Sequence, residues 1–341
     1  MLRWLTALLI ATQLACAYAP AVPIQAAPDR DCNVVESERF SFHDDPWINL
    51  HHFLYEWARN VPEKLADDRR RPVDVPERTQ LARLSDSEQQ AWSKAVAFYR
   101  ERLIQRDTTF DRNLIALRGE VGALACADAT ARIGDAELWT ALAGAMPVYR
   151  RHWWPVHHAS NTEWIRNEMA LLRTYETVLA RRLAEAYGGE WPAERVRVDV
   201  ARYSNWAGAY TTNQPNQLTI SSGDYKDLEG LELLFHEVSH ATFFEQRVFG
   251  QLAEAFQKRG AELPNLLVHL LQFLTPAELL RSQLQGEDLR TFRAVGDQVI
   301  ARGPMRSLEP VVRKHWKAFL DGQIDRSTAF DRIAADLVQG P

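Results

Sequence analysis

The feature that most constrains this chain is an apolar stretch, Leu231–Phe244 (LELLFHEVSHATFF), with two histidines four residues apart. Apart from Glu237, positions 233–244 carry no formal charge and contain neither proline nor glycine, so we expect a buried helix. On a helix His236 and His240 lie one turn apart on the same face, where two imidazoles can bind one Zn²⁺. Glu237 lies about 100° further round the helix, where its carboxylate can reach a water on the metal without becoming a ligand. The spacing therefore predicts a metal-binding helix of the H-E-x-x-H type.

This zinc interpretation has a structural alternative. The same stretch would suit a core helix whose two histidines are hydrogen-bonded and whose glutamate is there by chance. Three polar side chains on an otherwise apolar helix cost free energy unless each has a partner, and a metal would supply one. Zinc would also lower the pKa of a bound water to about 7, so that Glu237 could take its proton. We therefore expect zinc as the cofactor and Glu237 as the catalytic base.

The motif supplies two protein ligands, whereas a catalytic zinc site uses three and keeps one position open for water. Positions 241–250 contain no histidine, so a third one does not follow the motif at once. Among the later candidates, we expect Glu245 to lie too near on the same helix to turn back toward the metal. We expect Glu254 and Glu262 to be solvated. The choice then falls between the last two. In order, the five candidates are Glu245, Glu254, Glu262, His269 and Glu278.

The last two candidates differ in what else would explain them. His269 is almost the only polar side chain in positions 266–274, which read as a buried helix, so it needs a partner that a metal would provide. Glu278 follows Thr275 and Pro276 in a capping-box pattern, with the proline at the first position of a helix, which explains it without a metal. We favour His269 as the third ligand and keep Glu278 as the alternate.

The hydrophobic periodicity changes twice along the chain. Residues 46–187 favour helices. Residues 195–200 then alternate between apolar and polar side chains, which predicts a strand, and 206–212 and 217–222 are two further short strands. From position 229 onwards the pattern is helical again. These observations predict an α+β fold that is mostly helical, with a three- or four-stranded sheet packed against a helix over 229–247.

The first 27 residues are typical of an export signal. Arg3 gives a positive start, and the apolar run that follows is shorter than the roughly 18–20 residues of a membrane-spanning helix. We therefore expect a periplasmic or secreted protein, with lipid attachment at Cys16 as the less favoured alternative. Removal of residues 1–27 would leave Cys32 and Cys126 as the remaining thiols, and the sequence leaves open whether they pair.

Length and composition set the outer limits. With 341 residues, 46% of them hydrophobic, the chain can bury a sizeable core. A formal net charge of -5 argues against nucleic acid or an anionic membrane as the main partner. We expect one catalytic domain over 28–341 and no transmembrane span, and leave the oligomeric state open. Its parts would be a helical outer layer over 46–187, the sheet over 195–222, and the active-site and C-terminal helices over 229–341.

The motif, its uncharged flanks and the order of sheet before helix resemble the zincin metallopeptidases. The resemblance implies a small twisted sheet over the active-site helix, with an outer strand from residues 206–222 that pairs with extended substrate. Tyr203 and Tyr210 would then be candidate donors to the developing oxyanion, with simple packing in the sheet as the alternative for each. In the gluzincin branch the third ligand is a glutamate from a later helix. A histidine at position 269 would depart from that pattern.

The resemblance implies a function as well. It predicts a zinc-dependent hydrolase outside the cytoplasm, in the first place a peptidase acting on a peptide or another amide, in which Glu237 activates the water. The competing interpretation is a non-catalytic binding or structural module stabilised by a closed zinc site. An open metal position facing a cleft would favour the enzyme, and four protein ligands would favour the module.

Overall fold

The computed structural model describes residues 33–59, 73–108, 111–124, 131–213 and 215–339. The chain divides into two units, residues 1–30 and 31–341, and every described residue lies in the second. The expected export signal and all three cysteines lie outside the described residues. Among the residues described, none of the helices combines the length and apolar character that a membrane span requires.

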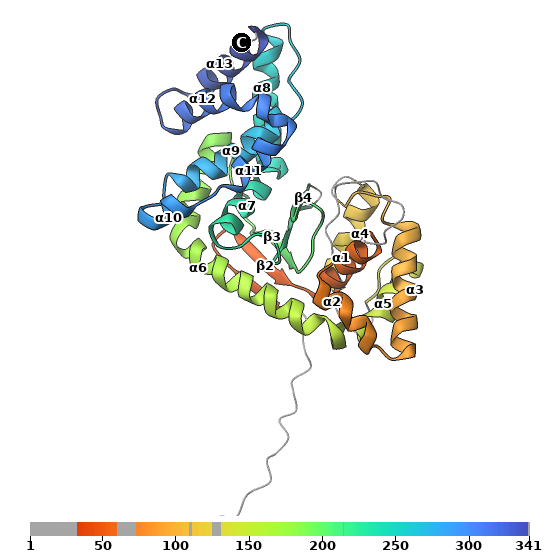
Figure 1. The fold of residues 1–341 in the computed structure, drawn as a ribbon. Coiled ribbons are helices and arrows are strands. Elements are labelled where there is room, and N and C mark those ends of the chain that lie inside the picture. The colour runs from red at the N-terminus through yellow and green to blue at the C-terminus, as the bar shows by residue number, and fades with distance from the viewer. Residues whose placement is uncertain (1–32, 60–72, 109–110, 125–130, 214, 340–341) are drawn as a thin grey trace, which may run out of the picture. The chain divides into compact units, whose positions relative to one another are not determined.

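The fold is built around a mixed five-stranded sheet (Figure 1). The strand order is β1-β2-β3-β5-β4; β2, β3 and β5 run parallel, and the two edge strands β1 and β4 are antiparallel to their neighbours. Together with the surrounding helices, this sheet confirms the predicted α+β class. The strands are β1 Asn33–Glu36, β2 Phe40–Asp44, β3 Val196–Ala201, β4 Ala209–Asn213 and β5 Asn216–Ser221.

Two of these strands were not predicted. β1 and β2 come from the segment before the first helix, so the expected three or four strands are corrected to five. Phe40 pairs with Val196 and Phe42 with Val198, more than 150 positions apart in the sequence. The four side chains turn one apolar face of the sheet toward the core. A pairing over that distance leaves no local signal beyond the alternation of β2 itself.

Helices pack against both faces of the sheet. The apolar face meets α6 (Trp154–Tyr187) and α7 (Asp227–Ser239), where the Phe40 and Phe235 rings lie edge to face at 5.8 Å. The opposite face is polar and meets α4, from which the buried Arg118 donates to the Thr219 hydroxyl at 2.7 Å and the Thr212 hydroxyl at 2.8 Å. The helices before the second half of the sheet are α1 Pro46–Arg59, α2 Val75–Thr79, α3 Asp86–Arg102, α4 Arg112–Ala123, α5 Ala136–His152 and α6 Trp154–Tyr187. Those after it are α7 Asp227–Ser239, α8 Thr242–Gln257, α9 Leu267–Arg281, α10 Gly286–Thr291, α11 Val295–Arg302, α12 Glu309–Leu320 and α13 Arg326–Gln339.

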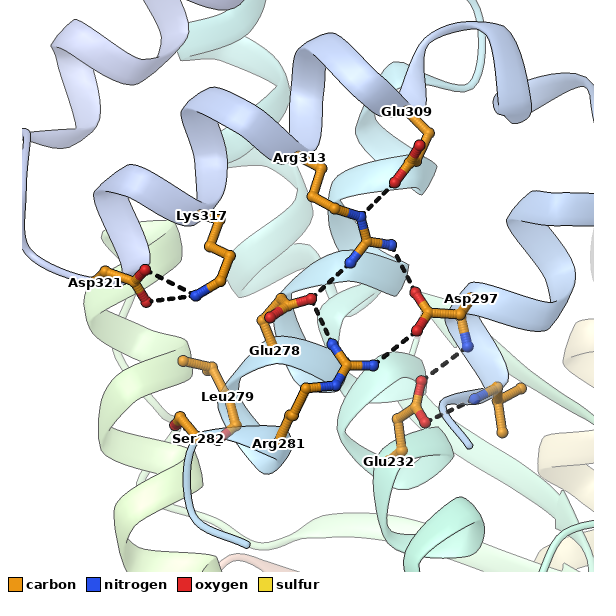
Figure 2. A network of polar contacts seen from close by, with 12 residues as sticks. Glu232, Glu278, Leu279, Arg281, Ser282, Asp297, Glu309, Arg313, Lys317 and Asp321 are labelled. Atoms are coloured by element: carbon orange, nitrogen blue, oxygen red, sulfur yellow. Dashed lines mark hydrogen bonds and ion pairs between the residues drawn. The ribbon is translucent and has the colours of Figure 1, made fainter. Parts of the chain in front are cut away.

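A network of ion pairs joins the C-terminal helices (Figure 2). One carboxylate oxygen of Glu278 on α9 accepts from Arg281 at 2.5 Å and from Arg313 of α12 at 2.6 Å. The same two guanidinium groups donate to Asp297 of α11, at 2.7 and 2.6 Å. Two arginines shared between two carboxylates therefore connect α9, α11 and α12.

Glu232 attaches α7 to this group of helices. Its two carboxylate oxygens accept from the backbone N–H groups of Val295 and Gly296, each at 2.8 Å, in the first turn of α11. These donors have no partner inside their own helix, so a carboxylate from another helix takes the place of a cap. Burial raises the pKa of Glu232 to about 8, although the two N–H groups act in the opposite direction.

The raised pKa of Glu232 predicts a pH-dependent stability. Because the folded pKa lies above the unfolded one, the contribution of Glu232 to the free energy of unfolding is complete below about pH 4.5. It is lost as the pH rises through 8, with a slope of at most about 1.4 kcal/mol per pH unit. We therefore expect urea denaturation to show the wild type losing stability relative to Glu232→Gln between about pH 5 and pH 9.

The exposed Glu254 supplies the control for this experiment. Its side chain is 65% exposed, so Glu254→Gln should keep a constant stability difference from the wild type over the same pH range. A constant difference for Glu232→Gln as well would show that Glu232 is ionised throughout.

Candidate metal centre

Three histidines from two helices meet at one point. His236 lies on α7, His240 is the residue at the end of that helix, and His269 lies in the first turn of α9. Their ligand nitrogens all lie within 4.8 Å of one another, and the Nε2 atoms of His236 and His240 are 3.4 Å apart. Two nitrogens bound tetrahedrally to zinc at about 2.0–2.1 Å would lie about 3.4 Å apart, so the arrangement fits a divalent cation.

The surroundings of the histidines leave nitrogen lone pairs for such a cation. The Nδ1 of His236 donates to the backbone carbonyl of Gln272 at 3.1 Å, which leaves Nε2 unprotonated in the neutral ring. Burial lowers the pKa of His236 well below its ordinary value, and the neighbouring histidines add to the effect. Burial also lowers the pKa of His269 to about 3. Both rings are therefore neutral near pH 7, as metal binding requires.

The helix that carries the motif ends earlier than the sequence predicts. α7 ends at Ser239 instead of continuing to position 247, because Ala241 has an extended backbone conformation (φ -61°, ψ 144°). α8 starts at Thr242, whose backbone N–H donates to the side chain of Asn216 on β5 at 3.0 Å. A side chain from the sheet thus caps the new helix in place of Ala241, which has no side-chain acceptor.

This break brings Glu245 back to the site. The sequence argument that Glu245 lies too near on the same helix is wrong, because the residue belongs to a second helix. Its Oε1 lies 3.6 Å from His240 Nδ1 and accepts from the Gln272 side-chain amide at 3.4 Å. A carboxylate behind the outer nitrogen of a ligand histidine fixes the ring and strengthens it as a ligand. Glu245 therefore lies behind a candidate ligand.

Glu237 contacts β4 and lines the same cleft as the histidines. The Thr211 hydroxyl lies 2.7 Å from both the Oε2 and the backbone carbonyl of Glu237, contacts that the sequence did not reveal. Burial raises the pKa of Glu237, with His240 and Thr211 acting in the opposite direction. A bound cation would favour the ionised form. The carboxylate is thus buried and oriented beside the three histidines.

The three histidines and Glu237 open into one cleft. Its volume is about 1050 Å³, and His236, Glu237, His240 and His269 are among the residues that line it. The whole of β4 lines the cleft as well. Because β4 is an edge strand, alternate backbone N–H and C=O groups point away from β5.

The two tyrosines expected near the oxyanion do not face the histidines. Tyr210 belongs to a cleft-lining strand, but its hydroxyl donates to His52 Nε2 at 2.8 Å, on the face of β4 opposite Thr211. The Tyr203 hydroxyl donates to Glu77 and accepts from the Asp74 backbone at 3.1 Å, and Tyr203 does not line the cleft. These hydrogen bonds favour a packing role for both hydroxyls, and the role at the oxyanion stays a prediction.

The alternate ligand Glu278 is also placed elsewhere. It is held by Arg281 and Arg313 in the network of Figure 2 and lies neither in the histidine cluster nor in the cleft lining. The expected cap is absent too. α9 runs unbroken through Pro276, and the Thr275 hydroxyl donates to the carbonyl of Leu271 at 2.6 Å, within the helix. The capping-box pattern is therefore overridden by the tertiary packing of a longer helix.

No family model, curated protein or solved structure matches this chain. The resemblance to zincins therefore stays a prediction, and the residues of the site carry it alone.

The geometry predicts which substitutions abolish metal binding. His269→Ala removes one of three candidate ligands, so we expect zinc affinity to fall by well over the roughly 100-fold typical of outer partners. Glu278→Gln should keep the affinity but lower stability by about 1–3 kcal/mol, because two arginines lose a charged acceptor. Chelator competition and thermal unfolding measure the two effects. Zinc loss in Glu278→Gln, with retention in His269→Ala, would reverse the assignment.

Glu245 gives a second prediction. Glu245→Ala removes the carboxylate behind His240, and we expect zinc affinity to fall by about 10- to 100-fold, measured by chelator competition. Glu254→Ala is a matched control on the same helix, since its carboxylate pairs with Lys258 at the surface. Equal affinities in the two variants would show that Glu245 plays no part in holding the metal.

Proposed function

We propose that this protein is a zinc-dependent hydrolase that cleaves amide bonds, with peptides as its substrates and with residues 1–27 directing it out of the cytoplasm. The observation that carries the proposal is the opening of three clustered histidines and a buried glutamate into one large cleft. His236, His240 and His269 would hold the ion. When bound, Zn²⁺ supplies a Lewis acid and acidifies water.

The chain's own residues supply the rest of the chemistry. The Glu237 carboxylate, oriented by Thr211, accepts a proton from the attacking water and delivers it to the leaving amine nitrogen. The backbone groups of β4 that point away from β5 would hold the substrate in an extended conformation along the cleft.

The competing structural zinc module needs a fourth protein ligand. Within the described part of the chain, the group at this site comprises three histidines, and Glu278 is committed to two arginines. Glu245 lies behind His240 and does not belong to that group. A site with three ligands facing a cleft supports the enzyme.

Substitution of Glu237 tests the proposal. Glu237→Gln keeps the shape of the side chain and removes its basicity, so we expect zinc to stay bound while hydrolysis falls by about 10²- to 10⁴-fold. The measurements are metal content and cleavage of a mixed peptide library followed by mass spectrometry, before and after chelation. A zinc-loaded wild type that leaves the library intact would contradict the hydrolase.

A further inference from the structure

Three large apolar side chains are exposed at the cleft. Trp206, Phe249 and Leu266 are 44%, 55% and 42% exposed, and all three line it. They come from three separate places: the loop between β3 and β4, helix α8, and the residue before α9. Side chains of this size are costly to leave in water, and their convergence on one cleft from different elements is typical of a binding surface.

Leu266 is held there against its local preferences. Its backbone is left-handed (φ 67°, ψ 0°), a conformation that glycine adopts freely and leucine does not. It also occupies the N-cap position, directly before α9, where polar side chains are favoured. Strain of this kind collects at ligand-binding sites. Leu266 lies three residues before His269, and both residues line the cleft.

The formally charged side chains that line the cleft are all acidic. Among the described residues that line it, the charged side chains are Glu237, Glu245 and Glu262, and neither lysine nor arginine occurs. Away from the three histidines, where a bound Zn²⁺ would lie, a free carboxylate or a phosphate would therefore meet like charge and neither lysine nor arginine to pair with it. The cleft suits a neutral or cationic segment.

We propose that the cleft selects an internal peptide segment with bulky apolar side chains next to the bond that is cleaved, and that it disfavours acidic residues and a free C-terminus. Leu266, Phe249 and Trp206 contact those side chains and determine specificity. The inference rests on the proposed function and adds the substrate class. A peptide suits the cleft better than an acyl chain because β4 offers backbone donors and acceptors along its length.

Binding measured without turnover tests this proposal. The zinc-loaded Glu237→Gln protein is titrated with fluorescein-labelled, N-acetylated and C-amidated peptides that carry Leu-Phe, Lys-Lys or Glu-Glu at the centre. We expect the Leu-Phe peptide to bind at least about tenfold more tightly than the Glu-Glu peptide, read as anisotropy. Adding Leu266→Gly should weaken the Leu-Phe peptide by about five- to thirty-fold without lowering the melting temperature, since glycine adopts the left-handed backbone freely.

Leu289→Ala is the matched control, because Leu289 is 45% exposed on α10 and does not line the cleft. It should leave every affinity unchanged. Equal affinities for the three peptides, an unchanged affinity in Leu266→Gly, or tighter binding of a fluorescent fatty acid than of the Leu-Phe peptide would each overturn the inference. Selective binding by a wild type that cleaves nothing would refute the hydrolase and leave only the peptide selectivity of the cleft. Cleavage without apolar preference would do the reverse.

Discussion

The candidate site depends on how one buried glutamine joins two helices. The backbone carbonyl of Gln272 accepts from His236, and its side-chain amide donates to the carbonyl of Ser239 at the end of α7 and to Glu245. The contacts with His236 and Ser239 satisfy groups that burial would otherwise leave unpaired. Because His269 lies one turn before Gln272 on α9, the same contacts that dock α9 onto the end of α7 also deliver the third histidine.

The parts of the site that are local in sequence could be predicted. Spacing along one helix places His236 and His240 together, and a lone polar side chain in an apolar helix identifies His269 as a residue that needs a partner. The place of Glu245 at the site could not be predicted, because the helix break that turns it back depends on a contact with Asn216 of the sheet. Local propensity cannot reveal a cap supplied by a distant strand.

The fold shows the same limit. The α+β class follows from periodicity, whereas the two extra strands depend on the long-range pairing of β2 with β3. Strand alternation puts Tyr210 and Thr211 on opposite faces of β4, but only the packing of α7 decides which face meets Glu237. Glu278 has a convincing capping pattern that the longer α9 overrides.

Pro276 accounts for one contact between α7 and α9. A proline inside a helix has no N–H, so the carbonyl four residues earlier lacks its helical donor. In α9 that carbonyl belongs to Gln272, and it is the oxygen to which His236 donates. The carbonyl of α9 that lacks its helical donor is therefore the acceptor for a side chain of α7. The imidazole of His236 thus takes the place of the donor that Pro276 removes, and one proline in α9 supplies the acceptor that orients a candidate metal ligand on α7.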